Sequence, residues 1–412
     1  MKSSRSDEEI NRNYAANEVQ GGQQKIEYTP GVEHKILTAV LFLVGFGLVM
    51  IFSASSYSAS LSSDSNYDST YYFKKQLIIM LGGMVILFIT NLIDYKLFKK
   101  LGWFFYVVAA ISVLLLKTPL GKEVNGATRW LVIAGFQIQV ADIVKICMII
   151  FMASFISSHW KSIHTWKTIC TLWGLVGIQA ALILIISSNL SSAIILLLMC
   201  FSITFIVSGN NKLHFAMLGI AIVAITIFVI VVKNNLPLES ELDKYPYQLR
   251  RFFAWLDPDK YSGTIGYQVL QSLYAIGSGG LLGKGLGNGT QKLVNIPEAQ
   301  NDMIFAIICE ELGLVGAILL FLMFGYLLYQ MFVVVRESRN LYGSLVVMGV
   351  MLHITYQIIV NVCVAVNPFP NTGVSLPFIS YGGSAMLFTL IEVGLVVGIR
   401  RQQAGKKYSR IN

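Results

Sequence analysis

The sequence predicts an all-α polytopic membrane protein with about ten transmembrane helices and one large extracytoplasmic loop. Of its 412 residues, 55% are hydrophobic and only 13% are charged, which does not suit a water-soluble surface. The apolar residues gather in runs of about 17 to 25 residues, the length that crosses a bilayer as a helix. Short segments rich in Lys and Arg separate many of these runs, as is typical of the cytoplasmic loops of membrane proteins.

The apolar runs also predict how the chain lies in the membrane. With the N-terminus inside, the inner segments hold most of the 31 lysines and arginines, so we expect both termini in the cytoplasm and the chain in the cytoplasmic (inner) membrane. These loops explain the net charge of +9, and no basic block interleaved with aromatics predicts nucleic-acid binding. The expected spans are 36–55, 76–93, 103–117, 140–157, 168–186, 190–208, 213–233, 302–333, 342–366 and 376–399.

Three regions follow from this pattern. Residues 1–34 are polar, mixed in charge and without the apolar core of a signal peptide, so we expect a disordered cytoplasmic tail. Residues 35–400 form the transmembrane domain, and 401–412 form a second cytoplasmic tail. Within the domain, the long segment 234–300 is expected to face outward.

This outer loop is not uniformly polar. Leu249, Phe252 and Trp255 are interleaved with Arg250 and Arg251, which predicts an amphipathic helix in the outer interface. A second such stretch runs through residues 267–274.

A glycine-rich run follows at residues 277–287. It is not a nucleotide-binding P-loop, because Ser278 occupies the place of the first glycine and Lys284 is followed by Gly285 instead of Ser or Thr. A flexible interfacial turn is the plainer interpretation. Free backbone N–H groups that meet a phosphate are the alternative.

Ionisable residues within spans are costly and by default mark a cavity or reaction site. Asp142 with Lys145, the neighbours Glu310 and Glu311, and Glu392 are of this kind. Asp142 and Lys145, three residues apart, are equally well explained by pairing with each other. The scattered cysteines and histidines show no dedicated metal motif.

Two further positions invite a functional and a structural interpretation. Pro297 suits a first helical turn, which would place Asp302 one turn inside the eighth span and on the face of Glu298, or leave it as an N-cap. Arg129 beside Trp130 reads as an anchor in the outer interface or as a phosphate-binding guanidinium.

Taken together, several separated motifs resemble the SEDS family (shape, elongation, division and sporulation), which includes FtsW, RodA and SpoVE. The resemblance spans about residues 36 to 400. The chain resembles the FtsW and SpoVE branch more than RodA. The similarity lies in the long N-terminal tail, the Ser53-Ala54-Ser55 end of the first span and the sequence of residues 371–374. The motifs are 125–130, 247–251, 266–272, 277–287, 297–305, 310–313 and 371–384.

The resemblance implies a peptidoglycan glycosyltransferase that polymerises lipid II at the outer face of the cytoplasmic membrane, for division or sporulation. It implies lipid II, a lipid-linked nascent glycan, a class B penicillin-binding protein and other divisome proteins as partners. A lipid II flippase or a non-catalytic division scaffold are the alternatives. A divalent cation (Mg or Mn) could assist the cations at the departing pyrophosphate. Asp302 aligns with the family's catalytic aspartate, and the expected substrate-binding residues are Arg129, Lys145, Arg251, Gln271, Ser272, Glu298 and Ser380.

Three segments depart from the family pattern. The family's Gln-Pro-Ser-Glu reads Gln139-Val140-Ala141-Asp142, and its Pro-Asp-Leu-Gly-Thr reads Ser188-Asn189-Leu190-Ser191-Ser192. The residue before Asp302, often threonine, is Asn301. The first two departures put in doubt how the fourth to sixth spans pack.

Overall fold

The computed structural model describes residues 29–124, 127–133, 135–209, 211–294 and 299–408. Within them, nine helices are long and apolar enough to cross a membrane, and a shorter apolar helix covers Gly102–Lys117. The expectation of about ten spans is therefore confirmed. The helices are α2 (Val32–Leu61), α3 (Tyr71–Leu92), α5 (Gly102–Leu114) continued by η2 (Leu115–Lys117), α6 (Val140–Ser158), α7 (Trp166–Ser187), α8 (Leu190–Ser208), α9 (Asn211–Asn234), α12 (Ile304–Glu337), α13 (Leu341–Ala365) and α14 (Gly383–Tyr408).

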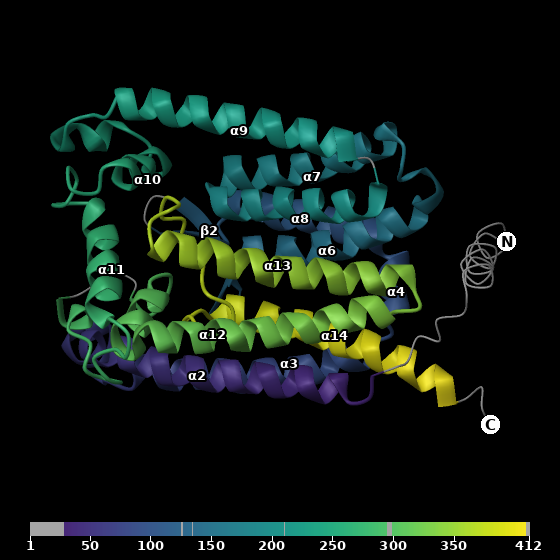
Figure 1. Ribbon diagram of the computed structural model, residues 1–412, viewed down its shortest axis with the longest axis horizontal. Coiled ribbons are helices and arrows are strands. Elements are labelled where there is room, and N and C mark those ends of the chain that lie inside the picture. Colours follow the sequence, from purple (N-terminus) through teal and green to yellow (C-terminus); the bar gives the residue numbers. More distant parts are fainter. Residues whose placement is uncertain (1–28, 125–126, 134, 210, 295–298, 409–412) are drawn as a thin grey trace. The chain divides into compact units, whose positions relative to one another are not determined.

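The spans differ in how deeply they are buried. In α6, 94% of the residues in the apolar stretch that would cross the membrane are buried, because this helix packs against α5, α8, α13 and α14. In α9 only 6% is buried, and this helix runs along one edge of the bundle (Figure 1). An apolar helix with so little protein contact must face lipid along most of its surface.

Two helices outside the bundle confirm the amphipathic pattern of the outer loop. They are α10 (Tyr247–Leu256) and α11 (Gly266–Gly279), and α11 runs across the end of the spans instead of along them (Figure 1). A small second hydrophobic core of Val232, Leu242, Phe253 and Tyr261 fixes α10 against the end of α9. Short 3-10 helices, η4 (Glu239–Lys244) and η5 (Gln291–Val294), complete this segment.

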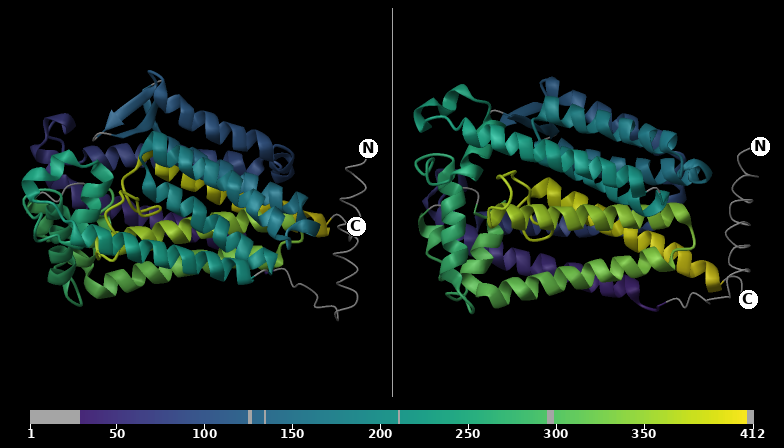
Figure 2. Two further views of the ribbon diagram at one scale, coloured as in Figure 1. Left: turned by 90° about the horizontal axis from the view of Figure 1, so that it is seen from above. Right: turned by 45° about the horizontal axis from the view of Figure 1, so that its top comes forward.

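A three-stranded antiparallel sheet between α5 and α6 departs from the all-α expectation. Its strands are β1 (Gly121–Val124), β2 (Ala127–Ile133) and β3 (Phe136–Gln139), in that order, and Leu131 of β2 pairs with Ile138 of β3. Figure 2 shows that the sheet lies at the same end of the bundle as α10 and α11. We call this the loop end; it carries the sheet, residues 235–294, residues 299–303 and residues 366–382.

The opposite end carries short basic loops and the short helix α4 (Tyr95–Lys100). The first residues of α2 and the last residues of α14 also lie at this end (Figure 1). Because the first span starts and the last span finishes at the same end of the bundle, the described chain crosses the bundle an even number of times. Which end faces the cytoplasm stays a prediction.

Two of the helix starts that differ from the sequence prediction lie at the loop end. Helix α14 begins at Gly383 instead of 376, because Phe378 has a φ of +64°, which a right-handed helix does not accommodate. Helix α12 begins at Ile304, with Met303 as its N-cap and residues 299–303 in turns. The expectation that Asp302 lies one turn inside this helix is therefore wrong, and so is its alternative role as N-cap.

Candidate active site

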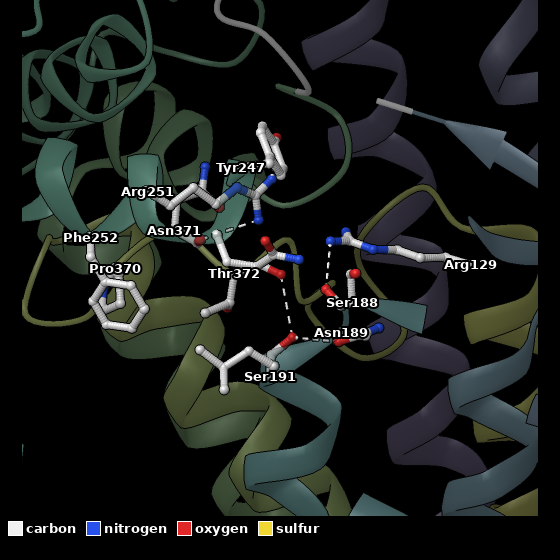
Figure 3. Close-up of a pocket in the computed structure, with 12 residues that line it drawn as sticks. Arg129, Ser188, Asn189, Ser191, Tyr247, Arg251, Phe252, Pro370, Asn371 and Thr372 are labelled. Atoms are coloured by element: carbon white, nitrogen blue, oxygen red, sulfur yellow. Dashed lines mark hydrogen bonds between the residues drawn. The ribbon is translucent and has the colours of Figure 1, made fainter. Parts of the chain in front are cut away.

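A pocket lined by polar side chains opens at the loop end, where four separate segments of the chain meet (Figure 3). One wall comes from β2, one from the turn between α7 and α8, one from α10 and one from the loop after α13. The described residues that line it include two arginines and no carboxylate. Its lining residues are Arg129, Ser188, Asn189, Leu190, Ser191, Tyr247, Gln248, Arg251, Phe252, Pro370, Asn371 and Thr372.

Strand β2 presents Arg129 to this pocket. Its Nη2 donates to the main-chain oxygen of Ser188 at 3.0 Å, and Ser188 ends α7 in the left-handed conformation (φ 51°), which turns that carbonyl toward the arginine. Among the described residues, the buried Nε of Arg129 has no hydrogen-bond partner. Burial lowers the pKa of Arg129, the nearby Arg251 lowers it further, and Tyr247 acts in the opposite direction.

Helix α10 presents Arg251 from the other side. Its Nη2 donates to the hydroxyl of Tyr247 at 2.6 Å, and its guanidinium lies 4.5 Å from the centre of that ring. Its Nη1 donates to the main-chain oxygen of Asn371 at 3.2 Å. Two guanidinium groups facing one pocket repel each other, so an anion bound between them would be stabilised by both.

Asp302 lies close to Arg251. It is 6% exposed, and its main-chain oxygen accepts a hydrogen bond from Nδ2 of Asn361 on α13 at 2.8 Å. Gly373 lies near both side chains: a Cβ added to this glycine would lie 3.7 Å from Nη1 of Arg251 and 3.8 Å from Oδ2 of Asp302. The structure therefore places a buried carboxylate close to one arginine of the pocket.

Comparisons with known proteins agree on one family. A family model for FtsW, RodA and SpoVE, described as cell cycle proteins, matches residues 34–405. The chain is 32% identical over 369 residues to stage V sporulation protein E of Bacillus subtilis (strain 168), covering 89% of this chain and 96% of that protein. It is 33% identical over 365 residues to a probable peptidoglycan glycosyltransferase FtsW of Trichlorobacter lovleyi, covering 88% and 92%.

The chain belongs to the FtsW, RodA and SpoVE family.

Solved structures show the same fold. A chain from a structure that describes the coordination of polymerization and crosslinking by a peptidoglycan synthase complex matches with a TM-score of 0.68 at 23% identity, covering 92% of this chain and 98% of that one. The rod shape determining protein RodA of Thermus thermophilus matches with a TM-score of 0.60 at 21% identity, with the same coverage. A SEDS fold is thus established by both sequence and structure, and the resemblance inferred from the motifs is confirmed.

Other SEDS motif residues lie outside the pocket. Lys145 is 4% exposed and pairs with Asp142 at 2.9 Å, and the other oxygen of that carboxylate accepts from Ser384 of α14. The i,i+3 pairing that was one of the two interpretations is therefore present. The hydrogen bond from Ser384 links α6 to α14. The departure from the family pattern at Gln139–Asp142 is therefore compatible with close packing between these two helices.

Two predicted substrate-binding residues make contacts within the protein, and a third lies outside the pocket. The hydroxyl of Ser272 donates to the main-chain oxygen of Ala365 at 2.8 Å and fixes α11 against α13. Ser380 accepts from the main-chain N–H of Leu376 at 2.7 Å within the loop before α14. Gln271, half-buried on α11, does not line the pocket. Their roles in binding substrate stay predictions, and Glu298 lies outside the described residues.

The second departure from the SEDS pattern lines the pocket directly. Asn189 caps α8 by accepting from the N–H of Ser192, and it also accepts from the hydroxyl of Ser191. Ser191 donates in turn to the main-chain oxygen of Thr372 at 3.3 Å. The sequence flagged this segment as unusual but assigned it no role in binding. Its signal was the cluster of small hydroxyl and amide side chains at a break between two apolar runs.

The described residues offer no ready cage for a cation. No three His, Cys, Asp or Glu side chains gather at metal-binding distance in the part of the chain that the structure describes.

Proposed function

We propose that this chain polymerises lipid II into glycan strands at the outer face of the cytoplasmic membrane. One observation carries the proposal: the buried carboxylate of Asp302 and the guanidinium of Arg251 both lie close to Gly373, beside the pocket that Arg129 completes. A base next to a paired cationic site suits the transfer of a glycosyl group from a pyrophosphate. The relatives named as peptidoglycan glycosyltransferases support the same activity.

The reaction assigns one task to each group. The 4-hydroxyl of one lipid-linked sugar attacks the anomeric carbon of another, and the bond from that carbon to the pyrophosphate oxygen breaks with inversion. Asp302 accepts the hydroxyl proton as general base. Arg129 and Arg251 stabilise the negative charge that develops on the departing polyprenyl pyrophosphate.

The unpartnered donor of Arg129 supports its assignment to this pyrophosphate. Buried polar atoms are nearly always hydrogen-bonded in native proteins. Arg129 and Thr372 both line the pocket, and the Nε of Arg129 and the hydroxyl oxygen of Thr372 are buried without a hydrogen-bond partner among the described residues. An oxygen of a bound pyrophosphate would supply the acceptor that the Nε lacks.

The proposed setting follows from the same reaction. Lipid II headgroups are polymerised outside the cytoplasm, so the loop end faces outward, residues 401–412 and 1–34 are cytoplasmic tails, and residues 35–400 form the transmembrane domain. A class B penicillin-binding protein would crosslink the strands, and other divisome proteins would recruit the pair to division or sporulation sites. The similar synthase complex, which combines polymerization with crosslinking, supports this partnership.

Polymerisation of purified lipid II tests the activity. Asp302→Asn keeps the side-chain shape but cannot accept the proton, so we expect glycan synthesis to fall by about a hundred- to ten-thousand-fold with unchanged expression. Asp259→Asn, which changes an exposed carboxylate of the outer loop, is the matched control and should retain activity. Glu298→Gln should have a milder effect than Asp302→Asn.

Supplying lipid II on the outer face only separates the alternatives. A polymerase makes chains there, whereas a flippase or an inert scaffold makes none. Chain formation by Asp302→Asn at the wild-type rate would show that another group is the base.

A further inference from the structure

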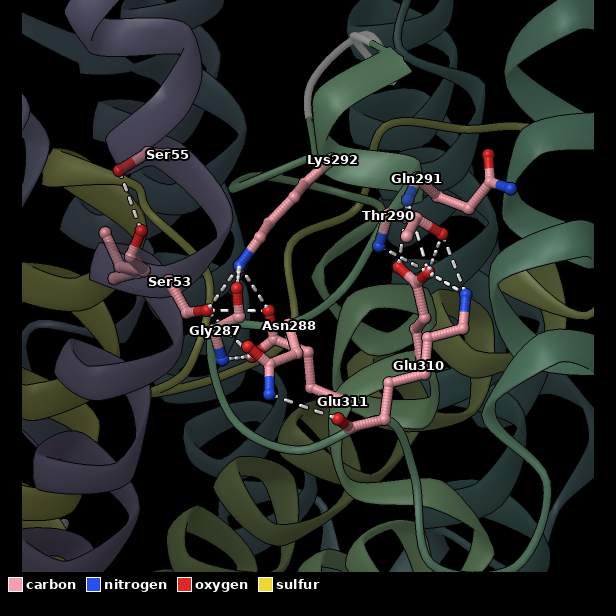
Figure 4. Close-up of polar contacts among 11 residues, drawn as sticks. Ser53, Ser55, Gly287, Asn288, Thr290, Gln291, Lys292, Glu310 and Glu311 are labelled. Carbon is pink, nitrogen blue, oxygen red and sulfur yellow. Dashed lines mark hydrogen bonds and ion pairs between the residues drawn. The ribbon is translucent and has the colours of Figure 1, made fainter.

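Two consecutive carboxylates lie fully buried in α12, eight and nine residues beyond Asp302. Glu310 and Glu311 are both 0% exposed, and neither lines the pocket. Buried carboxylates are stable only when paired and hydrogen-bonded, and here the glycine-rich run, residues 290–292 and the first span supply the partners (Figure 4).

Glu311 joins three parts of the chain. It accepts from the Nζ of Lys292 at 2.7 Å, from the hydroxyl of Ser53 on α2 at 2.7 Å and from the N–H of Gly287 at 3.1 Å. Lys292, itself 6% exposed, also donates to the oxygens of Ser53 and Gly287. Each charged group is therefore satisfied without a ligand.

Glu310 contacts the glycine-rich run and the residues that follow it. It pairs with Lys284 at 2.7 Å and accepts from the N–H groups of Thr290 and Gln291. The N–H groups of Lys284 and Gly285 donate to the main-chain oxygens of Glu310 and Glu311. These N–H groups, like that of Gly287, already donate to the protein's own oxygens, so they are not free to bind a phosphate.

The backbone of α12 is shaped to receive this run. The helix breaks at Gly313 (φ 65°, ψ −164°), and a Cβ on that glycine would lie 2.3 Å from the nitrogen of Gly283. Gly283 in turn has a φ of +76° and would collide with the oxygen of Glu311 if it carried a Cβ. Only glycine fits at either position, so the run and the helix are held in one register.

From this geometry we infer that the Lys292–Glu311 ion pair is a positioning device for Asp302. Lys292 precedes Asp302 by ten residues and Glu311 follows it by nine. The ion pair therefore joins the chain before the proposed base to the chain after it. Ser53 attaches that connection to α2. The inference rests on the proposed function, because it assigns the pair a role only if Asp302 is the base.

An equally buried ion pair on the same helix provides a matched control. At the other end of α12, Glu337 accepts from the Nη1 of Arg400 at 2.7 Å, and both side chains are 1% exposed. Glu311→Gln and Glu337→Gln therefore each neutralise one partner of a buried pair on α12, but only Glu311 lies in the part of the helix that follows Asp302 directly.

Hydrogen exchange and polymerisation kinetics test the inference together. In Glu311→Gln we expect faster amide exchange in residues 299–303 and a fall in kcat of about a hundredfold with little change in KM, because small displacements of a catalytic group cost this much. Glu337→Gln should show neither effect at a matched melting temperature. Ser53→Ala, which keeps the ion pair, should move both readouts in the same direction by a smaller amount. The exchanged pair Lys292→Glu with Glu311→Lys should recover part of the loss.

Two results would overturn the inference. One is unchanged exchange and kcat in both Glu311→Gln and Ser53→Ala; the other is an equal loss of kcat in Glu337→Gln. Because exchange is measured without turnover, these results differ from a failure of the proposed base, in which Asp302→Asn would stay active whatever Glu311 does.

Discussion

Nδ2 of Asn361 donates to the main-chain oxygens of both Asp302 and Val374, at 2.8 and 2.7 Å, from a side chain that is fully buried in α13. One amide thus clamps the turn that carries the proposed base to the loop that carries Gly373. The clamp sets the spacing between Asp302 and the cationic pocket. Both hydrogen bonds of Asn361 are to main-chain oxygens, so this residue would position Asp302 through the backbone.

Asn361→Ala is expected to lower both stability and activity. It leaves two buried carbonyl oxygens without their donor, which costs about 1 to 3 kcal/mol in the free energy of unfolding. We expect kcat to fall further than this loss explains, because Asp302 is no longer held. Gln357→Ala, one turn earlier on the same buried face, is the control. An equal loss of kcat in both variants would contradict the clamp.

Arg129→Ala should reduce polymerisation by about a hundred- to a thousandfold, the usual effect of removing one preorganised donor to a developing anion. Arg129→Lys should recover only part of the activity, because an ammonium cannot form the bidentate contact. Lys122→Ala removes an exposed cation from the neighbouring strand, opposite Trp130, and should leave the rate unchanged. Turnover of purified variants on lipid II checks all three. Near-normal turnover of Arg129→Ala would show that this residue is an interfacial anchor.

Gly373→Ala should block the site by placing a methyl group close to both Arg251 and Asp302. The left-handed φ of +68° adds a backbone cost of about 1 kcal/mol. Gly209→Ala has nearly the same φ of +65° and open space around it, so it carries the backbone cost without the obstruction. We expect similar melting temperatures and a large loss of activity only in Gly373→Ala. Equal activities would show that the space beside Gly373 is not used.

The outward orientation of the loop end can be tested by labelling. A cysteine at Lys260, exposed in the outer loop, should react with a membrane-impermeant maleimide in intact cells once the five native cysteines are replaced. A cysteine at Lys161, exposed at the opposite end, should react only after permeabilisation. The reverse pattern would place the pocket in the cytoplasm and contradict the proposed reaction.

The spans were predictable because a helix in lipid satisfies its backbone internally, so length and hydropathy almost determine it. The span predicted at 190–208 matches α8, and the amphipathic helices of the outer loop follow from a similar periodic pattern. The sheet was not predictable in this way. Its two outer strands are four residues long, too short for an alternating pattern to stand out from a loop.

The pocket depends on contacts that a single sequence does not record. Ser188 and Thr372 are separated in sequence by about half of the transmembrane domain, yet both line the pocket. The motifs identified Arg129, Arg251 and Asp302 individually. That Lys145 and Ser272 belong to packing contacts, and not to the pocket, depends on how the helices face one another, which hydropathy leaves undetermined.

Strand β2 imposes a constraint of its own on the outer surface. Strand β1 pairs Lys122 with Trp130 and Glu123 with Thr128, so Arg129 is the extra residue of a β-bulge. A bulge bends its strand and changes the direction in which the bulged side chain points. Deleting one residue here would restore regular pairing with β1 and remove the bulge that presents the guanidinium to the pocket. In a scan of deletions and substitutions, a change of chain length should therefore be tolerated less well than a change of residue identity beside Arg129, whereas the N-terminal tail should accept changes of either kind.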